Sequence, residues 1–121
     1  NIFFRHNKHK LAMSNAVKAL NLKLFADEKY LSPSITAVKT EGIDAEEFRK
    51  TIKNNFDILL AGGQDHMKGK IFRVGHLGYV NDRDIITVVS AISNTLLNLG
   101  KITSQQAGEA LVVASRYLEE T

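Results

Sequence analysis

One arginine lies within an apolar run of the sequence, where a charged side chain needs an explanation. Arg73 is flanked by Phe72 and Val74 in "KIFRVGH", residues 70–76. Burying a charge without a partner is costly, so the side chain either points outward into water or faces a cleft and binds an anion. A guanidinium suits a carboxylate, because its planar fork donates parallel hydrogen bonds to both oxygens. Alternation along the strand leaves both interpretations open.

Histidines are the other candidates for site chemistry, and the chain has four of them. His6 and His9 are three positions apart, a spacing at which two side chains on one helix face can bind a metal. Their neighbours are lysines rather than acids, so we expect both on the surface and predict no metal site. His76 follows Gly75 at a strand end, where it is either a polar group near a site or a packed imidazole. The roles of His66 and His76 stay open.

The glycines and the acids have structural explanations. The Walker phosphate-binding pattern needs Gly-Lys-Ser/Thr at the start of a helix, whereas Gly69-Lys70 opens an extended segment. We interpret the glycines of "AGGQDHMKGK", residues 61–70, as a corner between two strands that supplies positive φ angles. The dipole of a helix favours acids at its start, and the acids at predicted helix starts are Glu46, Glu47, Asp82 and Asp84. No set of catalytic residues is complete in this chain.

Hydrophobic periodicity predicts four helices. Apolar side chains spaced three and four apart indicate a helix over residues 2–20 and three more, which begin at the caps Asp44, Asp82 and Ser104. Glu47 lies three residues after Asp44 and nearly completes a capping box. Gly100 supplies a C-terminal stop for the third helix.

Extended runs predict four strands, over residues 22–26, 34–40, 57–63 and 70–76. In the last strand, Phe72 and Val74 share one face, and Ile71 and Arg73 share the other. The strands on either side of the loop at 62–69 are expected to pair antiparallel. The order of elements predicts a single α+β domain over residues 1–121, a two-layer sandwich with a small, mainly antiparallel sheet and helices packed on one face.

The composition fits one globular domain. The chain has 121 residues, of which 44% are hydrophobic and 24% charged, and it has no cysteine for disulfides or metal ligation. No apolar run reaches the ~18 residues that span a bilayer, so we predict a cytoplasmic location and no membrane partner. The opening at Asn1, directly before a helical pattern, leads us to expect a piece of a longer protein.

The positive charge is unevenly distributed. The formal net charge is +3, and residues 1–40 carry seven Lys and Arg against two acids. A basic region can bind nucleic acid, but here no exposed aromatics are interleaved with the basic residues. We therefore interpret this region as a solvated helix face and predict no nucleic-acid partner.

One long segment carries a family pattern. "LSPSITAVKTEGIDAEEFRKTIKNNFDILLAGGQDHMKGKIFRVGHLGYVNDRDI" resembles the C-terminal part of class V pyridoxal-phosphate aminotransferases. The nearest branch contains the alanine–glyoxylate and serine–glyoxylate (serine–pyruvate) aminotransferases, together with proteins labelled as the small subunit of soluble hydrogenase. The family's Ser-Pro-x-x-Thr-Ala-Val strand, Gly-Ile-Asp helix start, "AGGQ" and "GKIFRIGH" pattern all recur in register. The resemblance covers roughly residues 20–100.

The resemblance implies a function for Arg73. The chain would be the small domain of a fold-type I enzyme that moves an amino group between alanine or serine and glyoxylate or pyruvate. Arg73 matches the arginine that binds the α-carboxylate of the substrate. The large domain of the same protein, absent from this sequence, would hold pyridoxal 5'-phosphate and its lysine, so this chain alone would be inactive. The resemblance also implies a homodimer.

Two other functions stay open. The chain could be a free-standing α+β binding module that uses its basic face. It could also belong to another class V pyridoxal-phosphate enzyme, such as a lyase. Desulfurases of that class need a cysteine near this region, and the chain has none. In the aminotransferase interpretation, separation from the large domain exposes apolar surface, so we expect the isolated chain to self-associate.

Overall fold

Four helices and a four-stranded antiparallel sheet form the part of the chain that the computed structural model describes. These residues are 2–25, 35–75 and 81–119, with side chains in the first helix from residue 7 onward. In chain order, the elements are α1 (Ile2–Ala19), β1 (Lys23–Leu24), β2 (Ile35–Lys39), α2 (Ala45–Phe56), β3 (Ala61–Gly62), the short 3-10 helix η2 (Asp65–Met67), β4 (Ile71–Gly75), α3 (Asp82–Asn98) and α4 (Ser104–Glu119). The predicted order of helices and strands is confirmed. Among these residues, no helix has the length and apolar character needed to cross a bilayer.

The sheet places Arg73 between two neighbouring strands. The strand order is β1-β2-β4-β3, and each neighbouring pair is antiparallel. In β4, Arg73 pairs with Ala37 of β2 on one side and with Ala61 of β3 on the other. The predicted antiparallel pairing across the 62–69 loop is therefore confirmed. Because directly paired residues point to the same face, small side chains flank Arg73 on both sides.

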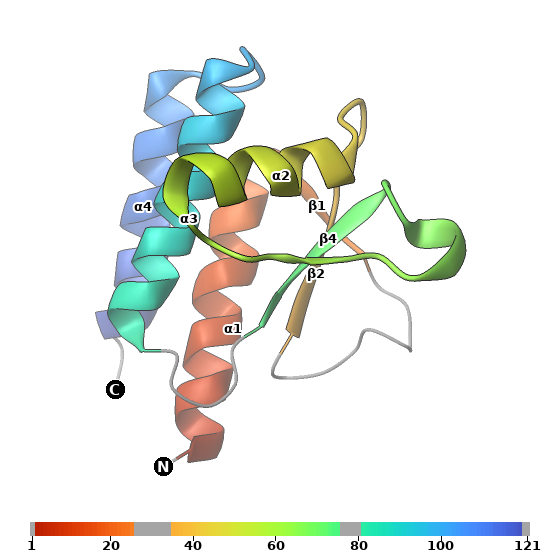
Figure 1. Cartoon of the computed structure of the whole chain (residues 1–121). Helices are drawn as coiled ribbons and strands as arrows, with labels where there is room; N and C mark the ends of the chain where they lie inside the picture. The colour runs from red at the N-terminus through yellow and green to blue at the C-terminus, as the bar shows by residue number, and fades with distance from the viewer. Residues whose placement is uncertain (1, 26–34, 76–80, 120–121) are drawn as a thin grey trace.

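The helices cover one face of the sheet, as the sequence predicts. Figure 1 shows α1, α3 and α4 side by side, with the strands next to α1 and with α2 lying across one end. Val38, Phe72 and Val74 point into this main core, and the Phe72 ring stacks on Phe48 of α2 with centroids 5.4 Å apart. On the opposite face, the described residues form a small separate cluster, built on Ala37 and Ile71. The α+β sandwich is confirmed.

Two helix caps differ from the prediction. Asn81, rather than Asp82, caps α3: its side chain accepts a hydrogen bond from the Asp84 backbone N–H, and the Asp84 carboxylate accepts one from the Asn81 N–H, both at 2.9 Å. Thr103, rather than Ser104, caps α4 through the Gln106 N–H at 3.1 Å. Each true cap lies one residue before the predicted one. Because Asp82 does not cap the helix, its carboxylate is available for a contact with another element.

The other predicted helix ends agree better with the structure. Asp44 caps α2 by accepting a hydrogen bond from the Glu46 N–H at 2.9 Å, so the nearly complete box with Glu47 does not form. Gly100 follows α3 with a φ of 72°, as expected of a C-terminal stop. Two large apolar side chains at helix ends are exposed: Phe56 at 39% at the end of α2 and Leu99 at 51% directly after α3.

Two strands are shorter than predicted, with two residues each in β1 and β3. The predicted strand over 57–63 begins late for two local reasons. Asp57 ends α2 in the left-handed conformation, with a φ of 55°. The Leu60 carbonyl accepts a hydrogen bond from Arg49 Nε at 2.8 Å instead of joining the sheet ladder. The segment before Ala61 is therefore bound to α2 rather than to β4.

Candidate functional site

Arg73 lies on the sheet face that the helices leave uncovered. It shares this face with Ile71 and Ala37, opposite Phe72 and Val74, so the predicted alternation is confirmed. The side chain is half-buried, and its Nε donates a hydrogen bond to the Gly62 carbonyl oxygen at 2.8 Å. Since a guanidinium is planar, a bond from Nε to a fixed carbonyl orients the whole group. The sheet thus presents a held cation on its open face.

Close packing surrounds the two glycines at the corner between β3 and β4, of which Gly62 accepts the Arg73 bond. A Cβ added to Gly63 would lie 2.4 Å from the Met67 carbonyl oxygen, and one added to Gly62 would lie 2.7 Å from Glu46 Oε2, at the end of a side chain. Positive φ, the reason expected from the sequence, applies instead to Gly69, at 83°. The corner therefore needs Gly63 for space beside the backbone and Gly69 for its backbone conformation, while Gly62 leaves room for the Glu46 side chain.

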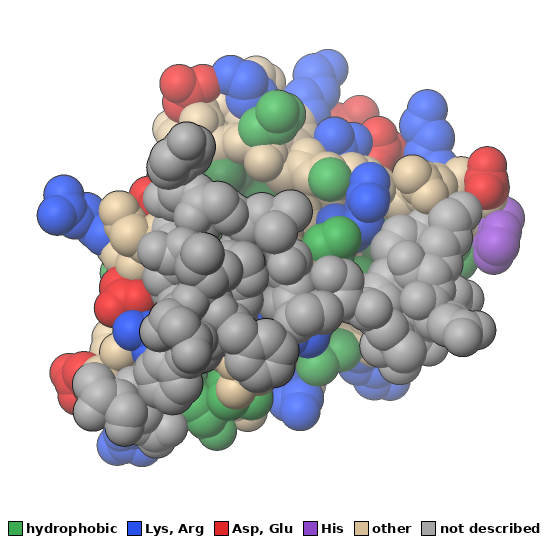
Figure 2. Space-filling model, turned by 90° about the horizontal axis from the view of Figure 1, so that it is seen from below, with side chains coloured by type: hydrophobic (Ala, Val, Ile, Leu, Met, Phe, Trp, Pro, Cys, Tyr) green, Lys and Arg blue, Asp and Glu red, His purple; other side chains and the backbone are tan. Residues whose placement is uncertain are grey.

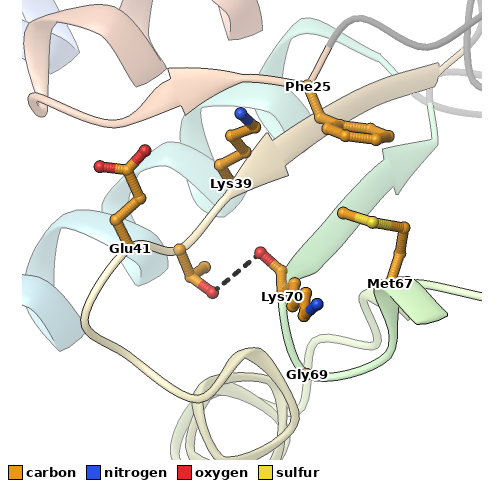
Figure 3. A pocket seen from close by; sticks show the side chains of 7 residues that line it. Phe25, Lys39, Glu41, Met67, Gly69 and Lys70 are labelled. Atoms are coloured by element: carbon orange, nitrogen blue, oxygen red, sulfur yellow. Dashed lines mark hydrogen bonds between the residues drawn. The ribbon is translucent and has the colours of Figure 1, made fainter.

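A pocket of about 420 Å³ opens beside the small cluster on the same sheet face (Figure 3). Phe25 and Met67 pack against the cluster of Ala37 and Ile71, and the Lys39 ammonium lies 5.8 Å from the Phe25 ring centroid. At the rim, the Thr40 hydroxyl lies 3.3 Å from the Lys70 carbonyl oxygen that it donates to, the contact dashed in Figure 3. The pocket on this face is therefore lined by apolar side chains together with two lysines, Glu41 and Thr40.

The histidines do not form a site among the described residues. His9 is fully buried, so its predicted surface position is wrong. Its Nε2 lies 2.9 Å from Asp82 Oδ1, and it must donate this hydrogen bond, because a carboxylate can only accept. His66 is exposed, and His76 lies outside the described residues. Across residues 7–25, 35–75 and 81–119, no three potential His, Asp or Glu ligands gather to bind a metal.

Basic side chains do not form one continuous patch on the face shown in Figure 2. In the visible part of that face, Lys and Arg are separated by acidic, apolar and other side chains. Several basic residues are already paired with acids, such as Lys23 with Glu41 at 3.6 Å and Lys8 with Asp82 at 3.2 Å. The alternative of a basic binding face gains no support from this distribution.

Comparison with known proteins identifies relatives of the chain. The chain is 51% identical over 117 residues to the soluble hydrogenase small subunit of a Synechococcus species, a match that covers 97% of this chain and 30% of that protein. It is 31% identical over 123 residues to the serine–glyoxylate aminotransferase of Methylorubrum extorquens, covering 99% and 30%. No protein-family model matches the sequence.

A solved structure gives the same result. The ureidoglycine–glyoxylate aminotransferase of Bacillus subtilis superposes with a TM-score of 0.81 at 30% identity, over 93% of this chain and 30% of that one. The chain matches the C-terminal portion of glyoxylate aminotransferases. It spans only about 30% of the length of these relatives. The aminotransferase resemblance identified from the sequence is therefore confirmed, and the helices and sheet described above are those of an aminotransferase small domain.

The names of the relatives differ in the chemistry that they describe. The Synechococcus relative is called a hydrogenase subunit, whereas the Methylorubrum and Bacillus relatives are called aminotransferases. This chain contains no cysteine, so any cysteine-ligated metal centre in the whole protein would lie outside these 121 residues. The residues of the aminotransferase-like domain thus contribute nothing to such a centre.

Proposed function

We propose that the chain is the small domain of a class V pyridoxal-phosphate-dependent aminotransferase and that Arg73 binds the α-carboxylate of its substrate. The substrates are a small amino acid, alanine or serine, and a 2-oxo acid, glyoxylate or pyruvate. The observation that carries the proposal is the position of Arg73 on the uncovered sheet face, with its Nε held at 2.8 Å from the Gly62 carbonyl. The names of the aminotransferase relatives support the reaction type.

Two features of Arg73 suit it to carboxylate binding. The residues paired with it on both sides are alanines, so the side chains next to the guanidinium across the sheet are small. A carboxylate that meets the edge of this oriented plane forms parallel, charge-assisted hydrogen bonds, which fix its direction as well as its distance. Binding of the carboxylate would then orient the amino group and Cα of the substrate for reaction.

Lys10 does not fit a covalent site for the cofactor, although its burial resembles that of reactive lysines. The burial of Lys10 lowers the pKa of its ammonium, a property that reactive lysines share. However, Lys10 Nζ donates a hydrogen bond to the Ile35 carbonyl and so is committed to joining α1 to β2. We therefore assign the cofactor lysine to the large domain of the whole protein. Pyridoxal phosphate, when bound there, would supply the electron sink of the reaction.

The test is transamination by the full-length protein with Arg73 replaced by Lys or Gln. Arg73→Lys keeps the charge but loses the fork, and Arg73→Gln loses both. Charge-assisted hydrogen bonds are worth roughly 1.5–3 kcal/mol, so we expect kcat/KM for the amino donor to fall about 10- to 100-fold, with the larger loss in Arg73→Gln. Arg83→Lys, at an exposed position in α3, is the matched control. Unchanged kcat/KM in both Arg73 variants would remove the proposed role.

We further propose that the whole protein is a cytoplasmic homodimer, as fold-type I enzymes generally are. Light scattering of the full-length protein measures its oligomeric state directly, and a mass of one protomer would contradict the proposed dimer.

A further inference from the structure

The carbonyl that holds Arg73 belongs to a segment with little backbone support of its own. β3 has two residues, Ala61 and Gly62, and only these pair with β4. Among the described residues, β3 is also an edge strand of the sheet. Side chains that contact this segment therefore help to hold the Gly62 carbonyl in position.

Arg49 of α2 supplies one such contact. Its Nε donates a hydrogen bond to the Leu60 carbonyl at 2.8 Å, two residues before the carbonyl that accepts from Arg73. The same guanidinium donates from Nη1 to Glu46 Oε1 at 2.8 Å, one helical turn earlier. Two fixed directions leave the planar guanidinium of Arg49 little freedom to rotate.

The Glu46–Arg49 pair also contacts Gly62 directly. A Cβ on Gly62 would lie 2.7 Å from Glu46 Oε2 and 2.8 Å from Arg49 Nη1, closer than a real side chain tolerates. Arg49 is only 26% exposed and Glu46 31%, and Glu46 Oε2 is buried with no hydrogen-bond partner among the described residues. The pair therefore lies against the bare backbone of Gly62, and a Cβ there would force these two side chains to shift.

We propose that Glu46 and Arg49 are positioning residues for Arg73, which act through the backbone of residues 60–62. Arg49 and the bare backbone of Gly62 fix the edge segment on α2, and the segment in turn presents its carbonyl to Arg73 Nε. This inference rests on the proposed role of Arg73. Because the Arg73 plane follows that bond, a displaced carbonyl tilts the surface that meets the substrate carboxylate.

The first experiment measures selectivity for a carboxylate in the full-length protein. We compare kcat/KM for L-alanine and L-alaninamide in Arg49→Lys and Glu46→Gln. The matched control is Lys53→Gln, which breaks the exposed Lys53–Asp57 pair of the same helix. We expect the alanine-to-alaninamide ratio to fall about tenfold in the two variants and to stay unchanged in the control, since misplacement by ~1 Å can cost up to a hundredfold. A loss of folded protein alone lowers both rates equally and would overturn the proposal.

A double mutant tests whether the effect passes through Arg73. In the Arg73→Gln background, Arg49→Lys should lower the ratio no further, because the group that it positions is gone. An additional, independent loss would contradict the inference.

A spectroscopic measurement separates this inference from the proposed function. In the full-length protein labelled with ¹⁵N-arginine, the Arg73 Nε–H signal is assigned by its loss in Arg73→Gln. We expect its hydrogen exchange to accelerate in Arg49→Lys and Glu46→Gln but not in Lys53→Gln. Unchanged exchange overturns the positioning role, whatever the activity. Accelerated exchange with an unchanged alanine-to-alaninamide ratio in Arg73→Gln supports positioning and contradicts the carboxylate-binding role.

Discussion

At the scale of single residues, Arg73 is held in one orientation. The arginine is half-buried on the sheet face that the helices leave uncovered, is flanked by two alanines and is oriented through Nε by the Gly62 carbonyl. The predicted role of Arg73 in substrate binding remains a prediction, and the kinetics proposed above test it.

The glycine corner gives a stability prediction at the same scale. Gly63→Ala places a Cβ 2.4 Å from the Met67 carbonyl oxygen, so we expect a loss of roughly 1–3 kcal/mol in the free energy of unfolding. Gly108→Ala is the matched control, because Gly108 lies inside α4 with nothing within 4 Å of an added Cβ. That substitution should stabilise the protein by up to ~1 kcal/mol through helix propensity. Urea unfolding measures both, and equal effects of the two would contradict the close-packing explanation.

At the scale of elements, Asp82 joins two helices. It is the first residue of α3, and its carboxylate accepts hydrogen bonds from His9 at 2.9 Å and Lys8 at 3.2 Å, both on α1. Partial burial alone would raise the pKa of Asp82, but these two contacts outweigh it and hold the pKa below its ordinary value of 3.8. The residue expected to cap a helix therefore bridges two helices instead.

This bridge predicts how stability depends on pH. A carboxyl whose pKa is lowered by folding stabilises the protein fully above its unfolded value, and the contribution is lost as the pH falls through the lower, folded value. Asp82 is 51% exposed, so solvent screening limits its contribution to about 0.5–1 kcal/mol. We expect Asp82→Asn to lose this amount at pH 7 and to converge with the unmodified protein once the pH has fallen below the lowered pKa of Asp82.

Urea unfolding between pH 7 and pH 2.5 measures the difference, with Asp57→Asn as control. Asp57 also has a lowered pKa, from its hydrogen bond with Lys53, but this pair lies within one exposed helix end and joins no two elements. A difference between Asp82→Asn and the unmodified protein that stays constant with pH would show that the carboxylate is not the source.

At the scale of the whole molecule, one face of the sheet carries the candidate site. Arg73 and a pocket lie on the face that the helices leave uncovered, and Lys10 is already bound to the Ile35 carbonyl. Large apolar side chains are also exposed elsewhere, among them Leu59 at 79% and Val112 at 50%. These features agree with a domain that carries only part of an active site, and self-association of the isolated chain stays a prediction.

Cofactor binding tests whether the cofactor lysine lies outside this chain. The 121-residue chain should bind no stoichiometric pyridoxal phosphate and show no transamination, whereas the full-length protein should do both. Absorbance spectra of the dialysed proteins and a coupled alanine–glyoxylate assay measure the two properties. Transamination by the chain alone would contradict the assignment of the lysine to the large domain.

The sequence by itself determined those features of the fold that depend on local periodicity. A strand alternates with a period of two whatever it pairs with, so Arg73 and Phe72 had to face opposite sides. Helical spacing likewise predicted the four helices, and the order of elements predicted the α+β sandwich. The family resemblance rests on the same kind of information, because its motifs are contiguous in the chain.

Only the tertiary structure decided which distant groups meet. The burial of His9 depends on Asp82, which lies 73 positions later, and no local pattern encodes that contact. The length of β3 depends on Arg49, which takes the Leu60 carbonyl away from the ladder. The close approach of the Glu46–Arg49 pair to Gly62 requires α2 and β3 to be packed first. Side chains choose partners by geometry across the fold, and that geometry exists only after the chain has folded.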